Sequence, residues 1–213
     1  MIRESEEEYL GAIYRLREAA TEPLPLSRLS SYFGYSPVSV HEMVQKLVNQ
    51  HTIVYHPYRG VTLTEKGESI ASALLRRHRL WERFLTDVLE IPWEDAHEFA
   101  GQLEHAAQGL VTERLAVFLG EPESCPHGAA IPPARNVIDD VCLLALPVGA
   151  VAKITRIAPE TPDLLHRVIE LNLVPGHQIS VLERGEDGTE ITCDERIVTV
   201  DANDAQRIWA EVI

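Results

Sequence analysis

The first apolar pattern in the chain is a stripe at helical spacing near the N-terminus. Apolar residues recur at intervals of three and four, as on one face of an α-helix. They are Tyr9, Leu10, Ile13, Tyr14 and Leu16. Ser5 can accept backbone hydrogen bonds as an N-cap, and the glutamates that follow it complement the helix dipole. We therefore predict a helix from Ser5 to about Ala20.

The next segments predict a helix-turn-helix followed by a β-hairpin. The run LSRLSSYFG indicates a short helix closed by Gly34, and Ser36-Pro37 opens a second helix, PVSVHEMVQKLVNQ. Two short helices joined by a tight glycine-containing turn are typical of helix-turn-helix. The segment TIVYHPYRGVTLT then contains two β-rich runs around residues 57–60, which predict a wing. Residues 1–74 are therefore expected to form a winged helix-turn-helix DNA-binding domain.

Two longer helical segments follow the wing. Thr64 begins a predicted helix that runs to residue 89, and another is predicted from about Trp93 to Leu119. Residues 121–136 hold four prolines and no periodicity, so we interpret them as a linker. Residues 75–140 are expected to be a helical domain with its linker.

The last third of the chain changes to short β-patterned runs. These runs, separated by turns, are VGAVAKITRI, GHQISVLER, TEITCD and RIVTVD, and one helix is expected around DLLHRVIELN. Residues 141–213 therefore predict a small β-barrel. The predicted fold class is mainly α with a small β component.

Composition and charge narrow the class of protein. The 213 residues are 45% hydrophobic without an apolar run near twenty, so we expect a soluble protein with no membrane contact. The N-terminus lacks a secretion signal, and three widely spaced cysteines argue against disulfides, so we expect a cytoplasmic location. A net charge of −14 opposes DNA binding, but much of the acidic excess lies in residues 136–213.

Potential metal ligands are concentrated after the wing. Between residues 78 and 127 the chain holds His78, Glu82, His97, Glu104, His105, Cys125 and His127. The members on each predicted helix share one face, and the last two flank Pro126 in the linker. Imidazole, carboxylate and thiolate suit a divalent first-row transition metal better than calcium or magnesium. A single His-x3-Glu step is ordinarily a solvated surface pair and proves little by itself. The whole set of ligands, next to a predicted DNA-binding domain, leads to the hypothesis of a metal-sensing regulator.

Six motifs follow one another along the chain: EEEYLGAIYRL, SPVSVHEMVQKL, YRGVTLTEKG, RHRLWERFL, LEHA and CPHGAAIP. In order and spacing they resemble the diphtheria toxin repressor family of metal-dependent transcriptional regulators, in its manganese-responsive branch. The C-terminal part is similar to an SH3-like FeoA domain. The resemblance implies a homodimer that forms through the helices after the wing and binds double-stranded operator DNA near metal-uptake genes when divalent metal is bound.

The resemblance also implies two metal sites and an ancillary ligand. Glu8, His78, Glu104 and His105 would form the first site. Glu82, Cys125, His127 and Asp163 would form the second, and His97 matches a ligand of an ancillary site. The chain departs from its relatives at Gly11 and Gly101, where a carboxylate or thiolate would be expected. Manganese(II) is the expected ion, with iron(II) or zinc(II) as alternatives.

The DNA-binding surface is expected on the second helix of the helix-turn-helix and on the wing. Residues expected near base edges are Ser36, Pro37, Ser39, His41 and Gln45. Those expected on phosphates or in the minor groove are Arg28, Lys46, Tyr58 and Arg59.

Two other functions are weighed against a metal-activated repressor. One is a constitutive winged-helix repressor whose zinc is only structural. The other is a zinc hydrolase, which the sequence disfavours because it has neither a His-Glu-x-x-His motif nor an obvious nucleophile arrangement. We therefore expect that the protein is not an enzyme.

Overall fold

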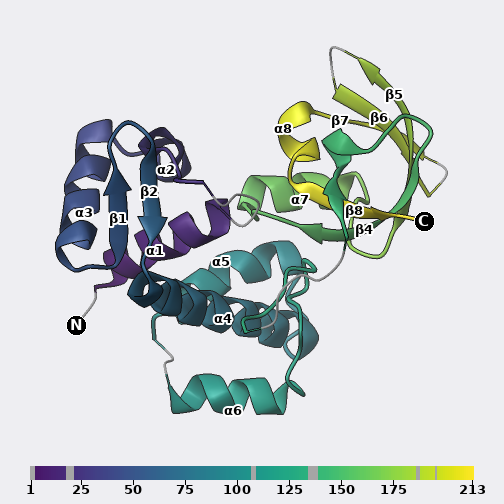
Figure 1. The fold of residues 1–213 in the computed structure, drawn as a ribbon. Coiled ribbons are helices and arrows are strands. Elements are labelled where there is room, and N and C mark those ends of the chain that lie inside the picture. The colour runs from purple at the N-terminus through teal and green to yellow at the C-terminus, as the bar shows by residue number, and fades with distance from the viewer. Residues whose placement is uncertain (1–2, 18–21, 107–108, 134–138, 186–187, 195) are drawn as a thin grey trace.

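The computed structural model describes residues 3–17, 22–106, 109–133, 139–185, 188–194 and 196–213. Figure 1 shows a helical lobe with a small hairpin, a second helical lobe, and a separate lobe built on a sheet. None of the helices in these ranges is long and apolar enough to cross a membrane.

The N-terminal lobe is a winged helix-turn-helix, as predicted. Its elements are α1 (Glu4–Leu16), α2 (Leu26–Phe33), α3 (Pro37–Asn49), β1 (Ile53–His56) and β2 (Gly60–Leu63). Leu10, Leu29 and Leu47 are fully buried between them, because each lies on the inner face of its helix. A Cβ at Gly60 would lie 1.9 Å from the carbonyl oxygen of Leu24, and its φ is +127°, so this position in the wing requires glycine.

The first helix differs from the prediction at both ends. Arg3, rather than Ser5, is the N-cap residue, and its backbone N–H donates to Glu6 Oε2 at 3.0 Å. The side chain of Glu6 reaches back in the way a capping-box glutamate does, so the serine is not needed. The helix ends at Leu16, and Ala20 lies outside the described residues.

The middle lobe contains α4 (Glu65–Asp87), α5 (Trp93–Leu103) and α6 (Leu110–Phe118). α4 is continuous across residue 74, so a single helix joins the wing to the rest of this lobe (Figure 1). The prediction of one helix from Trp93 to Leu119 is wrong. α5 stops at Leu103, and Gly109 precedes α6 with a φ of +61°, a conformation that glycine adopts without strain.

The C-terminal lobe is a six-stranded antiparallel sheet in the order β3-β8-β4-β5-β6-β7. The strands are β3 (Val141–Cys142), β4 (Val151–Ile157), β5 (Gln178–Gly185), β6 (Gly188–Cys193), β7 (Arg196–Val200) and β8 (Ile208–Val212). The chain also forms a 3-10 turn (Leu143–Ala145), α7 (Pro162–Glu170) and α8 (Ala202–Ala205). Apolar side chains of the sheet and of α7 share one core. The predicted fold class, mainly α with a small SH3-like domain, is confirmed.

Candidate metal centre and DNA-binding surface

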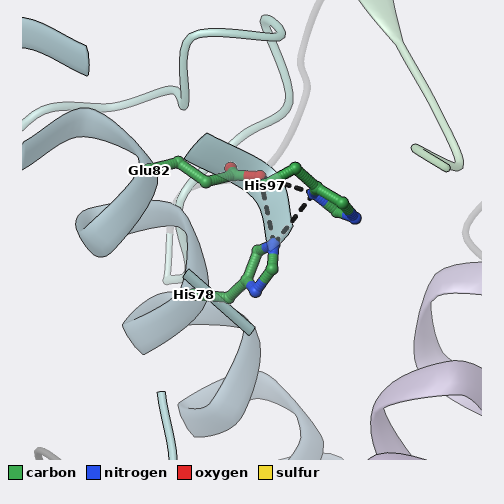
Figure 2. A group of neighbouring side chains, drawn as sticks. All are labelled: His78, Glu82 and His97. Atoms are coloured by element: carbon green, nitrogen blue, oxygen red, sulfur yellow. Dashed lines mark hydrogen bonds and ion pairs between the residues drawn. The ribbon is translucent and has the colours of Figure 1, made fainter. Parts of the chain in front are cut away.

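Three of the predicted ligands meet between α4 and α5. His78 and Glu82 are one turn apart on α4, and His97 faces them from α5 (Figure 2). Glu82 Oε1 lies 3.0 Å from His78 Nε2 and 2.8 Å from His97 Nδ1, and the two ring nitrogens are 3.1 Å apart. The donor atoms therefore converge on one point.

Glu82 also faces Cys125 and His127 on the segment that follows α6. His127 Nδ1 lies 3.3 Å from Glu82 Oε1 and 3.7 Å from Cys125 Sγ. All three side chains are buried. His127 Nε2 lies 3.1 Å from the carbonyl oxygen of Trp93. With the proton on Nε2, this hydrogen bond orients the ring and leaves Nδ1 available as a ligand.

The sheet holds the His127 segment in place. Ile157 N donates to the carbonyl oxygen of His127 at 2.9 Å. At Gly128, whose φ is +83°, an added Cβ would lie 2.1 Å from the carbonyl oxygen of Thr155. Glycine thus allows the segment to approach β4 closely, and residues 121–133 are more ordered by tertiary contacts than a linker would be.

The C-terminal lobe brings a buried carboxylate, Glu160, near this group, whereas the expected Asp163 lies at the surface. Asp163 is exposed in the first turn of α7 and is not one of the side chains that meet at Cys125. Glu160, in the loop before α7, is 3% exposed, and its charge affects the pKa values of His97 and Cys125. Burial opposes its ionisation, but Arg79, 3.8 Å away, lowers its pKa. The only sequence signal for Glu160 is an isolated acid between two prolines.

A second group joins the winged-helix lobe to the end of α5. His105 Nε2 lies 2.8 Å from Glu8 Oε1 and 3.4 Å from Glu104 Oε1. Its Nδ1 lies 2.9 Å from Glu7 Oε2, a contact that no pattern in the sequence indicates. His78, expected here, contacts Glu104 Oε2 through Nδ1 at 2.7 Å. Because His78 Nε2 also contacts Glu82, this histidine connects the two groups that the sequence treats as separate.

The glycines that replace expected ligands have different surroundings. A Cβ at Gly101 would meet no described atom within 4 Å, so a larger side chain would fit there. At Gly11 an added Cβ would lie 3.0 Å from Leu74 Cδ2, where helices α1 and α4 pack closely.

The histidines and carboxylates of these groups shift one another's pKa values, and an incoming cation must displace protons from the histidines. Burial disfavours a charged imidazole, but the carboxylates of Glu82 and Glu104 raise the pKa of His78 to about 9. Burial also opposes ionisation of Glu82, yet His127 and His78 hold its pKa well below the usual value. The same Glu82 charge raises the pKa of His127 despite its burial. Burial raises the pKa of the Cys125 thiol and lowers that of His97.

One carboxylate oxygen supports the fit of these residues to a metal ion. Glu82 uses Oε1 for every contact above, whereas Oε2 is buried without a hydrogen-bond partner among the described residues. Glu160 Oε1 also accepts no hydrogen bond within the described ranges, but the Arg79 guanidinium, 3.8 Å away, places a positive charge beside it. A buried carboxylate oxygen without a partner is costly in free energy unless a cation binds it. A donor set of nitrogen, oxygen and one sulfur suits a first-row transition metal.

Most of the expected DNA-binding residues are exposed on α3 or between the two strands of the wing, whereas Arg28 on α2 also lines a cavity shared with the C-terminal lobe. Ser36 caps α3 by accepting from Ser39 N at 3.2 Å, and Pro37 occupies the first turn. Exposed members of the predicted set are Arg28, Ser36, Pro37, Ser39, His41, Gln45, Tyr58 and Arg59. Lys46 differs, because its ammonium lies 2.7 Å from the buried Glu6 Oε1. This ion pair links α3 to α1, and the phosphate contact of Lys46 remains a prediction, since its side chain is 40% exposed.

Sequence comparisons divide the chain in the same way as the structure. The family model "Iron dependent repressor, N-terminal DNA binding domain" matches residues 1–61, "Iron dependent repressor, metal binding and dimerisation domain" matches 64–133, and "FeoA domain" matches 141–212. The iron-dependent repressor IdeR of Mycobacterium tuberculosis is 32% identical over 190 residues, 82% of each chain. The chain belongs to the iron-dependent repressor family. This confirms the resemblance to the diphtheria toxin repressor, and the family is one of metal-dependent transcriptional repressors.

Solved structures of family members superpose over nearly the whole chain. A manganese-dependent transcriptional repressor in complex with manganese gives a TM-score of 0.87 at 29% identity, covering 98% of this chain and all (100%) of that one. ScaR with bound Zn2+ gives 0.86 at 28% identity, with coverage of 98% and 99%. Divalent metal binding is therefore a property of the family, and its members bind different ions.

Proposed function

We propose that this family member is a manganese(II)-activated repressor of metal-homeostasis genes, with iron(II) and zinc(II) as competing activators. It would act as a homodimer on operator DNA in the cytoplasm. The observation that carries the proposal is the buried Glu82 Oε2, which has no hydrogen-bond partner in the described part of the chain although Cys125 and His127 lie beside Glu82. A divalent ion would supply the missing partner of this oxygen.

Ligands from separate lobes support a regulatory role for the metal. Glu8 belongs to α1 of the DNA-binding lobe, whereas Glu104 and His105 lie at the end of α5. Glu160 similarly brings the C-terminal lobe to the Glu82 group. Residues that bind one ion from two lobes restrict the angle between those lobes. Two recognition helices must enter successive major grooves about 34–36 Å apart, so such a restriction favours operator binding.

An exposed apolar face of α6 supports dimerisation. Leu110 is 72% exposed and Phe118 is 65% exposed. Val111 and Val117 of the same helix are also exposed, and their spacing places all four side chains on one face. Apolar patches of this kind on soluble proteins mark interaction surfaces. We infer that a second copy of the chain covers this one.

Burial of the candidate metal ligands argues for regulation rather than catalysis. A zinc hydrolase needs an open coordination position that substrate can reach, together with a general base. Glu82, Cys125 and His127 are each at most 2% exposed, so a substrate has no access to the metal position between them. The thiolate would also bind zinc strongly, and cellular availability of the ions would decide between manganese and zinc.

The deciding experiment measures DNA binding across metals. Duplexes selected from a random library with the manganese-loaded protein are tested by fluorescence anisotropy with Mn(II), Fe(II), Zn(II) or chelator. We expect about 5–150-fold tighter binding with the activating ion, the usual size of an allosteric coupling. Cys125→Ala should lose this response and the matched Cys142→Ala should keep it. Equal binding in chelator would support the constitutive repressor with structural zinc instead.

A further inference from the structure

A different group of metal-binding side chains gathers at one end of the C-terminal sheet. His177 ends the segment between α7 and β5, Cys193 is the last residue of β6, and Asp194 follows it. One donor atom of each lies within 4.8 Å of the other two. None of these residues belongs to the groups around Glu82 and His105, so the regulatory function leaves this arrangement unexplained.

The loop residue Asn172 holds the thiol and the carboxylate side by side. Alternate residues of β6 face the core, which leaves Cys193 only 2% exposed. Cys193 Sγ donates to the carbonyl oxygen of Asn172 at 3.3 Å, and Asn172 Nδ2 donates to Asp194 Oδ2 at 2.6 Å. Asn172 has a φ of +59°, a conformation that asparagine tolerates better than most residues. The segment is therefore shaped to bring both donors together.

The ring nitrogen of His177 indicates a missing partner. His177 Nδ1 lies 3.0 Å from Asp194 Oδ2, but this buried nitrogen makes no hydrogen bond of acceptable geometry within the described residues. In the tautomer with the proton on Nε2, the Nδ1 lone pair faces the carboxylate at this distance, which is unfavourable unless both atoms bind one cation. Two potential ligand atoms that lie close together without a hydrogen bond between them are arranged as two ligands of one ion are.

We propose that His177, Cys193 and Asp194 bind one divalent ion of the zinc class. One nitrogen, one sulfur and one oxygen donor are three protein ligands of a tetrahedral ion, with water as the fourth. Binding releases the thiol proton to solvent, and the resulting thiolate selects zinc over manganese or magnesium. The ion would link the segment between α7 and β5 to the turn between β6 and β7, and so stabilise the C-terminal lobe independently of operator binding.

Cobalt(II) absorption tests the thiolate ligand in the full-length protein. Because Cys125 also gives a thiolate signal, every protein in this experiment carries Cys125→Ser. We expect one sulfur-to-cobalt charge-transfer band per chain, which Cys193→Ser removes and Cys142→Ser retains. Absence of the band in the Cys125→Ser protein, or its survival in Cys193→Ser, would overturn the proposal.

Native mass spectrometry with zinc tests the same site without touching a buried residue. His177 is about one-third exposed, with a side-chain accessibility of 32%, so His177→Gln should fold normally. We expect it to weaken binding of one zinc per chain by about tenfold or more, the scale seen when metal sites lose a supporting contact. His166→Gln, on the exposed face of α7, is the matched control. Identical zinc binding by the two variants would contradict the site.

Discussion

Glu82 Oε1 lies 3.3 Å from His127 Nδ1, although the first residue is on α4 and the second is on the segment that docks against β4. The same oxygen contacts His78 and His97 on its other side. A single buried carboxylate therefore joins the α4–α5 ligands to the Cys125 segment. A change at Glu82 should affect every ligand in this group.

Glu82→Gln is expected to abolish high-affinity metal binding at the Cys125 centre and the metal response of DNA binding. The amide removes the negative charge that offsets two buried imidazoles, the partly exposed His97 and an incoming cation. Isothermal titration with Mn(II) and Zn(II) measures the first effect and anisotropy measures the second. Glu98→Gln, at an exposed position on α5, serves as the control and should behave as the unmodified protein.

Glu160→Gln should weaken metal binding at the same centre, whereas Asp163→Asn should leave it unchanged. Glu160 is buried beside the group, and Asp163 is exposed on α7. Loss of one ligand or of a group that orients a ligand commonly costs about 10–100-fold in metal affinity. Competition titrations against a chromogenic chelator compare the two variants. The opposite ranking would restore Asp163 as the ligand from the C-terminal lobe.

Metal affinity should increase with pH across the neutral range. The neighbouring carboxylates of Glu82 and Glu104, working against burial, raise the pKa of His78 to about 9, so His78 carries a proton at pH 7. A ligating ring nitrogen must lose that proton, and binding is therefore weaker below about pH 9 and becomes independent of this group above it. Calorimetry in buffers of different ionisation enthalpy counts the protons released. A constant affinity between pH 7 and 9 with no proton release would refute the coupling.

Glu6→Gln should lower the free energy of unfolding by about 1–2 kcal/mol at pH 7, because a buried carboxylate loses its charged hydrogen bonds to partly exposed Lys46. Burial of Glu6 opposes its ionisation, but Lys46 lowers the pKa to about 2 from 4.5. A lowered pKa gives stability that is complete above about pH 4.5 and lost as pH falls to about 2. Urea unfolding should show the two proteins converging in acid. Exposed Glu4→Gln is the control.

Substitutions on the DNA-binding surface should separate sequence reading from phosphate contact. Gln45→Ala on α3 should reduce discrimination at one base pair by about 1–3 kcal/mol. Arg59→Ala in the wing should weaken binding to all duplexes. It should also reduce the slope of log affinity against log salt concentration by about 1. Anisotropy across a set of single-base operator variants and salt concentrations distinguishes them. Identical profiles for the two variants would contradict the assigned roles.

Local patterns in the sequence determined the order of the elements and the kinds of ligand. The i,i+4 spacing of His78 and Glu82 places both on one face of any helix that includes them, whatever it packs against. The glycine and proline signals around Gly34, Pro37 and Gly60 likewise act within a few residues. For these reasons the winged helix-turn-helix, the candidate ligands on α4 and α5 and the family resemblance follow from the amino-acid sequence alone.

Tertiary structure decided which of these residues meet. Glu160 and Asp163 are three positions apart, and only the docking of the C-terminal lobe buries one and exposes the other. The end of α5 at Leu103 and the pairing of Lys46 with Glu6 also depend on contacts between segments. Such contacts are set by packing among distant parts of the chain, and helical or strand periodicity carries no information about them.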